Sequence, residues 1–240
     1  HVPLIPRSLP QLLYAMERYI KNIGTLSPQE NKSLQRRKVA VVGCGGLGGH
    51  VIELLGRLGI GNITAIDYDV FEISNLNRQL LSDEASLGRS KALQAQKRIK
   101  QINSTVTVSP IIKKLDRQNG IQLLSGHDVI IDALDNIPSR LILQDIAEAL
   151  GIPMVHGAIA GWYGQVSTIF PGDKTLSKIY PNPNAEGVEK ELGNPSFTPA
   201  LIASIEVSEA LKILIGRGSL LRKKLLSINL LDQEYEIIDF

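Results

Sequence analysis

The sequence predicts an α/β protein with a Rossmann-like fold: a mostly parallel, doubly wound sheet with antiparallel C-terminal strands and a long crossover loop. Short apolar segments alternate with helical patterns between residues 38 and 170, which is typical of a sheet covered on both faces. A glycine-rich turn joins the first of these segments to the helix that follows, as in nucleotide-binding folds. A long helical pattern and two strand-like segments complete the chain.

The individual elements follow from the period of their apolar residues. An N-terminal helix is expected over residues 10–22, with one apolar face made of Leu12, Leu13, Met16 and Ile20. Strands are expected over residues 38–42, 62–67, 106–112, 127–133, 153–159 and 165–170, and helices over 46–58, 88–102, 139–150 and 198–215. Residues 224–231 and 234–240 suit a closing β-hairpin.

Residues 171–195 interrupt this pattern. They show no hydrophobic period and contain Pro181, Pro183 and Pro195. A loop of this length inside a compact domain is usually functional or mobile. We therefore expect a single domain over residues 1–240, made of an N-terminal helical arm (1–37), a nucleotide-binding core (38–170), a mobile crossover loop (171–197), and a C-terminal helix and hairpin (198–240).

The composition, with 43% hydrophobic and 21% charged residues, is that of an ordinary globular protein. A net charge of +2 gives no reason to expect nucleic acid or a membrane as a partner, and no apolar run approaches the roughly 20 residues of a membrane span. The N-terminus lacks the basic start and long apolar core of a secretory signal. Cys44 is the single cysteine, which excludes an intrachain disulfide and a cysteine-based zinc site. We expect a cytoplasmic protein.

Gly43, Gly45 and Gly48 form the pattern G-x-G-x-x-G directly after the first strand of the core. Gly43 suits the tight turn, Gly45 lets backbone N–H groups approach phosphate oxygens, and Gly48 lets the helix pack close to the sheet. The N-terminus of that helix adds partial positive charge. Asp67 ends the next strand, at a distance that suits a ribose. These residues alone leave both ATP and a nicotinamide dinucleotide open.

Charged residues further along the chain favour ATP. Arg78 lies in the polar segment after the second strand of the core, and Lys91 begins the next helix. A triphosphate needs charge compensation beyond the glycine loop, and these side chains supply a fork of donors and a point charge. Asp132 and Asp135 follow a later strand, at the carboxyl edge where ligands bind in such sheets. A carboxylate there can hold Mg²⁺ against the phosphates.

The motifs GCGGLG, D-x-D, NLNRQ, GRSK and DALDN occur in this order, and together they resemble the ThiF/MoeB/HesA family, bacterial relatives of the ubiquitin-activating enzymes. The resemblance runs from about Arg18 to Leu214. It implies an adenylyltransferase that uses ATP to activate a C-terminal carboxylate and releases pyrophosphate. In the family that carboxylate commonly belongs to the Gly-Gly tail of a small ubiquitin-like sulfur carrier protein.

The resemblance also implies roles for the residues that match these motifs. They are Gly43, Gly45, Gly46 and Gly48 around the nucleotide, Asp67 on the ribose hydroxyls, Asn75, Arg78 and Lys91 on the phosphates, Asp135 on Mg²⁺, and Asp69 and Gln79 of the same motifs beside the nucleotide. No general base is needed for adenylation, because the attacking carboxylate is already ionised near neutral pH.

Three features depart from the family pattern. Many members carry R-Y-x-R near the N-terminus, and the second arginine reaches the nucleotide of the partner subunit in a homodimer. Here Lys21 stands in its place, which keeps the charge and loses the fork. Many members also hold zinc with two C-x-x-C pairs, but residues 175–181, at the place of the first pair, contain no cysteine. We therefore expect no zinc.

The third departure is a crossover loop without the cysteine that captures the activated carboxylate in several relatives. Activity should then stop at the acyl-adenylate or pass it to an external nucleophile. An NAD-dependent oxidoreductase and a non-catalytic partner subunit are the alternatives, and the joint presence of Arg78, Lys91 and Asp135 argues against the second. The acyl substrate stays open between sulfur carriers for thiamine or molybdopterin synthesis, a peptide C-terminus and a modified tRNA adenosine.

Overall fold

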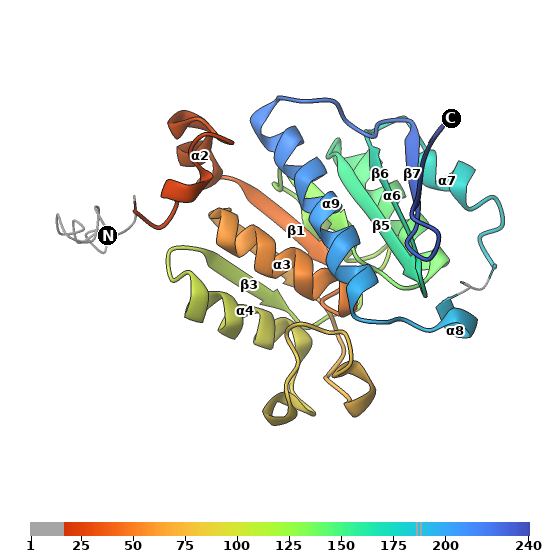
Figure 1. Cartoon of the computed structure of the whole chain (residues 1–240), viewed down its shortest axis with the longest axis horizontal. Coiled ribbons are helices and arrows are strands. Elements are labelled where there is room, and N and C mark those ends of the chain that lie inside the picture. Colours follow the sequence, from red (N-terminus) through yellow and green to blue (C-terminus); the bar gives the residue numbers. More distant parts are fainter. Residues whose placement is uncertain (1–16, 186, 188) are drawn as a thin grey trace.

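The computed structural model describes residues 17–185, 187 and 189–240, and these form one eight-stranded sheet in the order β3-β2-β1-β4-β5-β6-β7-β8 (Figure 1). The parallel part comprises β1 (Lys38–Val42), β2 (Asn62–Ile66), β3 (Thr107–Ile111), β4 (Val129–Asp132) and β5 (Met154–Ala160). The antiparallel part comprises β6 (Tyr163–Ile169), β7 (Lys224–Asn229) and β8 (Glu234–Asp239). The strand order reverses beside β1 and β4, which is where open α/β sheets bind ligands.

Helices cover both faces of this sheet. The helices α3 (Gly46–Leu58), α4 (Lys91–Ile102) and α9 (Phe197–Ile215) contribute to one hydrophobic cluster, and Figure 1 shows α3, α4 and α9 on the same side of the strands. The helices α5 (Gly120–Leu124), α6 (Ile137–Leu150) and α7 (Thr175–Ile179) contribute to a second cluster on the opposite face. The predicted doubly wound fold is therefore confirmed.

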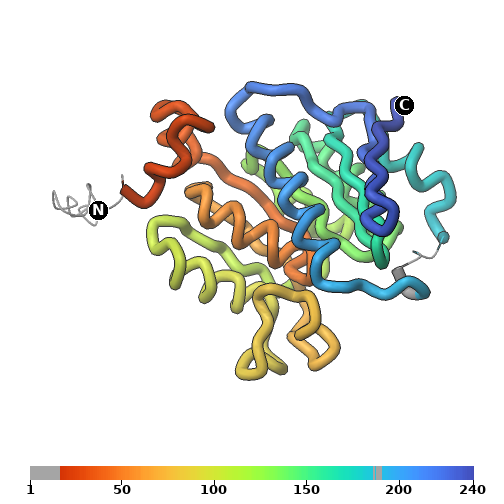
Figure 2. The backbone as a smooth tube through the Cα atoms, viewed as in Figure 1, coloured from red at the N-terminus to blue at the C-terminus, as the bar shows by residue number. Residues whose placement is uncertain are grey.

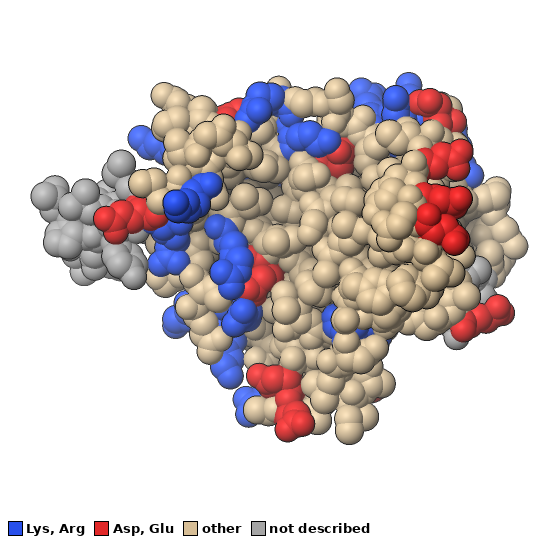
Figure 3. All heavy atoms as spheres, viewed as in Figure 1, with Lys and Arg blue, Asp and Glu red and all other residues tan. Residues whose placement is uncertain are grey.

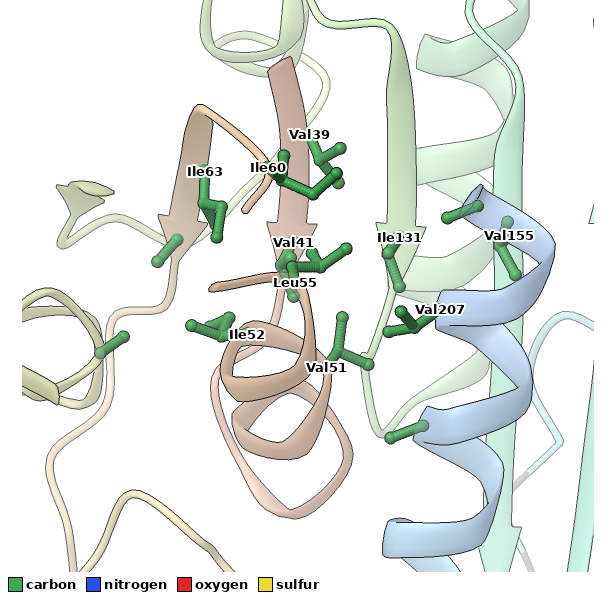
Figure 4. Close-up of a cluster of buried hydrophobic side chains, with 14 of the residues drawn as sticks. Val39, Val41, Val51, Ile52, Leu55, Ile60, Ile63, Ile131, Val155 and Val207 are labelled. Atoms are coloured by element: carbon green, nitrogen blue, oxygen red, sulfur yellow. The ribbon is translucent and has the colours of Figure 1, made fainter. Parts of the chain in front are cut away.

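The β1 strand supplies both clusters because its side chains alternate between the two faces. Val39 and Val41 belong to the cluster beneath α3, whereas Ala40 and Val42 belong to the cluster beneath α6. In Figure 4 the side chains of Val51, Ile52 and Leu55 of α3 lie against β1 around Val41, and Val207 of α9 lies near Val155. A strand buried on both faces has a continuous run of apolar residues. This is why the sequence predicted both the first and the last residue of β1, Lys38 and Val42.

Other predicted elements agree in type, and their ends shift by a few residues. The expected helix over residues 10–22 lies mostly outside the described residues, and Ile20–Asn22 is a short 3₁₀-helix, η1. Two short helices were missed: α5, and α2 (Pro28–Leu34). The segment expected to be a structureless loop contains α7 and α8 (Glu189–Leu192). Short helices of this kind carry little periodicity, although the capping box of Ser27 and Glu30 was a usable signal for α2.

Residues 68–90 leave the sheet after β2 and return to it at α4, forming the yellow excursion in Figure 2. The excursion contains the 3₁₀-helices η2 (Ile73–Asn75) and η3 (Glu84–Ser86). On the face drawn in Figure 3, basic side chains gather over the half of the molecule that carries α3 and α4. Arg57 and Arg98 there both pair with the buried Glu53, and Lys97 and Lys100 are exposed. None of the described helices combines the length and apolar character that a membrane span requires.

Candidate nucleotide-binding site

A cleft opens at the carboxyl ends of β1, β2 and β4, the place where the strand order reverses. Nine of the predicted site residues line it: Gly43, Gly45, Gly46, Asp67, Asp69, Arg78, Gln79, Lys91 and Asp135. Gly48, Asn75 and Lys21 do not. The fold thus brings together side chains that are up to 92 residues apart in sequence, from Gly43 to Asp135.

The glycine turn has the geometry that the motif predicts. Gly43 has φ of +98°, and a Cβ there would lie 2.5 Å from the carbonyl oxygen of Ala133. A Cβ on Gly48 would overlap the carbonyl oxygen of Gly43, so Gly48 acts through packing rather than through ligand contact. No side chain caps the N-terminus of α3 at Gly45. The N–H groups of the first turn of α3 are therefore suited to bind an anion.

Asp67 is held by the backbone of two neighbouring segments. Its Oδ2 accepts a hydrogen bond from the N–H of Cys44 (2.7 Å), and its Oδ1 accepts one from the N–H of Asp69 (2.8 Å). Burial raises the pKa of Asp67, and these two hydrogen bonds oppose that rise. Each carboxylate oxygen keeps a further lone pair, so the fixed carboxylate can still accept the hydroxyls of a ribose.

Arg78 and Gln79 close the cleft opposite the glycine turn. The side chain of Arg78 passes 3.4–3.5 Å from the place of a Cβ on Gly46, and its Nη1 donates to the carbonyl oxygen of Ser74 (3.1 Å). Gln79 is buried beside Gly45, and its Oε1 has no hydrogen-bond partner among the described residues. A buried amide oxygen without a partner in a native protein calls for an explanation such as a bound ligand or water.

Asn75 is one of the three predicted residues that do not line the cleft. Its Oδ1 accepts a hydrogen bond from the backbone N–H of Glu72 (3.0 Å), and its carbonyl oxygen accepts from the N–H groups of Arg78 (3.1 Å) and Gln79 (2.9 Å). Asn75 therefore shapes the turn that presents Arg78 and Gln79. The motif predicted that Asn75 contacts the phosphates, but its side chain faces the turn rather than the cleft.

Cations surround the cleft. Lys91 is mostly buried, and its Nζ lies 3.4 Å from Oδ2 of Asp69. Lys113 and Lys114, which follow β3, line the cleft from the other side, and the Nζ of Lys114 lies 5.8 Å from the ring centre of Tyr68. The sequence analysis missed this pair, although two lysines directly after a parallel strand were a usable signal for the same sheet edge.

Asp135 stands on the turn between β4 and α6. Its Oδ1 accepts from Nδ2 of Asn136 (3.1 Å), and Oδ1 of Asn136 caps α6 by accepting from the N–H of Ser139 (3.0 Å). The described residues contain no group of three His, Cys, Asp or Glu side chains that could hold a metal ion. A single carboxylate fits Mg²⁺ in a nucleotide site, because that ion usually takes one or two carboxylates together with phosphates and water.

Sequence reasoning also missed several further polar residues, two of them inside the motifs: Tyr68 is the middle residue of D-x-D, and Asn136 ends DALDN. Tyr68, Asn136, Ser139, Arg140 and Asn194 also line the cleft. Asn194 belongs to the crossover segment, and its carbonyl oxygen accepts from Nδ2 of Asn77 (3.0 Å), which joins that segment to the excursion after β2. Nothing in the sequence signalled this contact across 117 residues.

The chain matches the ThiF family model over residues 17–240. It belongs to the ThiF family. The SAMP-activating enzyme E1 of Haloferax volcanii is 32% identical to it over 230 residues, covering 94% of this chain and 85% of that protein. The sulfur carrier protein adenylyltransferase of Thermus thermophilus is 34% identical over 231 residues, covering 92% of this chain and 85% of that protein. The family predicted from the sequence motifs is confirmed.

Solved structures share the fold of this ThiF-family chain. The E. coli MccB structure with ATP superimposes with a TM-score of 0.80 at 20% identity, covering 92% of this chain and 70% of that one. The crystal structure of selenomethionine PaaA gives a TM-score of 0.80 at 22% identity, covering 100% of this chain and 77% of that one. At 20% and 22% sequence identity, this structural similarity shows a shared fold and no more.

Lys21 and Cys44 do not line the cleft. Lys21 lies in η1, and its expected role concerns the nucleotide of a second subunit, so it stays a prediction. Cys44 is fully buried in the glycine turn, and burial raises the pKa of its thiol well above the ordinary value. A buried, protonated thiol is a poor nucleophile.

Proposed function

We propose that this protein is an ATP-dependent adenylyltransferase that activates the C-terminal carboxylate of a small sulfur carrier protein or of a peptide, giving acyl-AMP and pyrophosphate. One observation carries the proposal: Arg78, Lys91 and Asp135 line the same cleft as the glycine turn. The names of the ThiF-family relatives support the same reaction. A dehydrogenase has no evident use for this combination of charges beside its pyrophosphate.

In this proposal the chain mainly positions the two substrates and neutralises the charge of the phosphates. The first turn of α3 and Gly45 receive phosphate oxygens, Asp67 accepts the ribose hydroxyls, and Arg78 and Lys91 balance charge that develops on the leaving pyrophosphate. Mg²⁺ bound through Asp135 would screen the phosphates from the incoming carboxylate. The carboxylate oxygen forms a bond to the α-phosphorus as the bond from that phosphorus to the pyrophosphate oxygen breaks, so no proton needs to be transferred.

A second cavity adjoins the cleft, and we assign it to the C-terminal tail of the acyl substrate. It shares Asp135, Arg140, Ala158 and Ile159 with the cleft and extends along β6 to Tyr163, Gly164 and Ser227. A Cβ on Gly164 would overlap the side chain of Ile202, so β6 packs closely against α9 at this point. Apart from Asp135 and Arg140 its lining is uncharged, which suits a tail of small, uncharged residues.

Several finer features belong to the same proposal. The enzyme would act as a homodimer in which Lys21 approaches the nucleotide of the other subunit. It would need no zinc, because hydrogen bonds hold the segment at the place of the family's first C-x-x-C pair: Gln144 accepts from the N–H of Leu176 (2.8 Å) and donates to Ser177 Oγ (3.1 Å). A cytoplasmic location is part of the same expectation.

The decisive measurement is ATP–pyrophosphate exchange with candidate carrier proteins and peptides. Exchange should require the acyl substrate, and calorimetry should detect binding of ATP with Mg²⁺ and no binding of NAD. Asp135→Ala should abolish exchange, whereas Asp145→Ala, which alters a surface carboxylate paired with Arg117, should not. Binding of NAD in preference to ATP, or exchange that survives Asp135→Ala, would refute the proposal.

A further inference from the structure

A chain of hydrogen bonds joins the crossover segment to the sheet beside the cleft, and two of its members, Tyr180 and Gln165, line the second cavity. Nδ1 of His156 lies 2.8 Å from Oδ2 of Asp132, and both side chains are fully buried. The hydroxyl of Tyr180 lies 3.2 Å from Nε2 of His156 and 2.6 Å from Nε2 of Gln165. Tyr180 follows α7 directly and is the last residue before Pro181.

The donors and acceptors in this chain have one consistent direction. A carboxylate only accepts, so Nδ1 of His156 donates to Asp132. Burial lowers the pKa of His156, so Nε2 of the neutral ring accepts a hydrogen bond from the hydroxyl of Tyr180. The phenolic oxygen then accepts from Nε2 of Gln165 and from Nη1 of Arg140 at 3.3 Å. Every bond in the chain therefore depends on its neighbour.

Both ends of this network hold Leu134, the residue before Asp135. Oδ1 of Asp132 accepts from the N–H of Leu134 (3.1 Å), and Nη2 of Arg140 donates to the carbonyl oxygen of Leu134 (2.6 Å). Nη1 of Arg140 also donates to the carbonyl oxygen of Gly157 (3.1 Å), which ties the same turn to β5. Buried polar groups thus hold both the N–H and the carbonyl group of Leu134, directly before Asp135.

We infer that Tyr180, His156 and Arg140 are positioning residues for Asp135, so that the placement of the metal-binding carboxylate depends on the start of the crossover segment. The inference rests on the proposed function, in which Asp135 holds Mg²⁺. The segment after Tyr180 also supplies Asn194 to the cleft. A displacement of that segment would alter the position of Asp135 through four hydrogen bonds. They join Tyr180 to His156, His156 to Asp132, Asp132 to Leu134, and Arg140 to Leu134.

The test compares nucleotide affinity with and without Mg²⁺ by calorimetry in Tyr180→Phe and His156→Gln. Both variants should reduce the gain in ATP affinity that Mg²⁺ provides by about tenfold or more, the usual cost of removing a group that orients a metal ligand. Affinity in EDTA should stay within about twofold of wild type. The double variant should lose no more than the more damaging single variant, because both substitutions break one chain.

His127 provides the matched control. Its Nε2 lies 2.7 Å from Oγ1 of Thr64 and its Nδ1 lies 2.9 Å from the carbonyl oxygen of Leu124, away from the cleft lining, so His127→Gln should keep the full gain from Mg²⁺. An unchanged gain in Tyr180→Phe and His156→Gln, with only a lower melting temperature, would overturn the inference. Asp135→Ala separates the two proposals: if it also keeps the gain, the metal role of Asp135 is wrong, and if it alone loses the gain, only the positioning role is wrong.

Discussion

Glu206 gives a prediction that depends on the fold and not on the reaction. It lies on α9 beneath Gly157 of β5, where a Cβ on Gly157 would overlap its carboxyl group. The side chain is fully buried, and neither carboxylate oxygen has a hydrogen-bond partner among the described residues. Burial raises the pKa of Glu206 well above the ordinary value, Asp132 adds to this rise, and Arg140 opposes it. We expect a neutral carboxylic acid at this position near pH 7.

The sign of the pH effect follows from proton binding. Above the ordinary glutamate pKa the unfolded chain releases this proton and the folded chain keeps it. The stability that the neutral acid contributes is therefore complete at low pH and is lost as the pH rises towards the folded pKa. Glu206→Gln removes the ionisation from both states. The difference in free energy of unfolding between Glu206→Gln and wild type should therefore shift in favour of the variant as the pH rises from 5 to 8. The slope of this difference is at most about 1.4 kcal/mol per pH unit.

Urea unfolding at a series of pH values measures this slope directly. Each kcal/mol corresponds to about 2–4 °C in melting temperature for a domain of this size, so thermal scans provide a second readout. The neutral amide also adds a constant offset, so the argument rests on the slope alone. Glu209→Gln is the control: Glu209 accepts from Thr168 Oγ1 (2.5 Å) and the N–H of Leu221 (2.8 Å) and pairs with Lys212, so its loss should destabilise the fold at every pH in this range. A stability difference between Glu206→Gln and wild type that stays flat from pH 5 to 8 would refute the reasoning.

Three shorter predictions concern the reaction. Arg78→Ala should slow pyrophosphate exchange about 10²–10³-fold if its guanidinium stabilises charge in the transition state, while Arg89→Ala, outside the cleft lining, should leave the rate unchanged. Cys44→Ser should keep adenylation, and intact-mass analysis after turnover should find the enzyme unmodified; an acyl adduct that dithiothreitol removes would contradict the placement of Cys44. Light scattering should find a dimer at micromolar concentration, and Lys21→Ala should impair turnover; a monomer or unchanged kinetics would count against the role of Lys21.

The parts of the fold that the sequence made predictable are those whose signal is local. The β1 strand and α3 were predicted to the residue, because a buried apolar run, a glycine turn and an amphipathic helix each carry their own pattern. The mostly parallel sheet with helices on both faces followed from the alternation of strands and helices. By contrast, α7 is held through Gln144 of a distant helix, and a five-residue helix fixed by tertiary contacts has no period to detect.

The candidate site divides in the same way. The motifs identified residues on the strand ends, but they could not say which amide of a loop faces the cleft. Asn75 and Gln79 lie four positions apart, and the turn directs one inward and the other into its own backbone. No motif assigned a role to His156, and its pairing with Asp132 spans 24 residues. Such pairings become visible only when two strands are placed side by side.

The balance of charge in the cleft decides between the two nucleotides that the glycine motif leaves open. Five cationic side chains line it, Arg78, Lys91, Lys113, Lys114 and Arg140, against the three carboxylates Asp67, Asp69 and Asp135. Asp67 already accepts two backbone N–H groups, and Asp69 faces Lys91, so both carboxylates are partly compensated before a ligand binds. The excess of positive charge suits a ligand with more than two phosphates, because Mg²⁺ neutralises only part of their charge. A dinucleotide has only two phosphates and would compensate less of this positive charge than ATP, and enclosing like charges in one cleft is unfavourable.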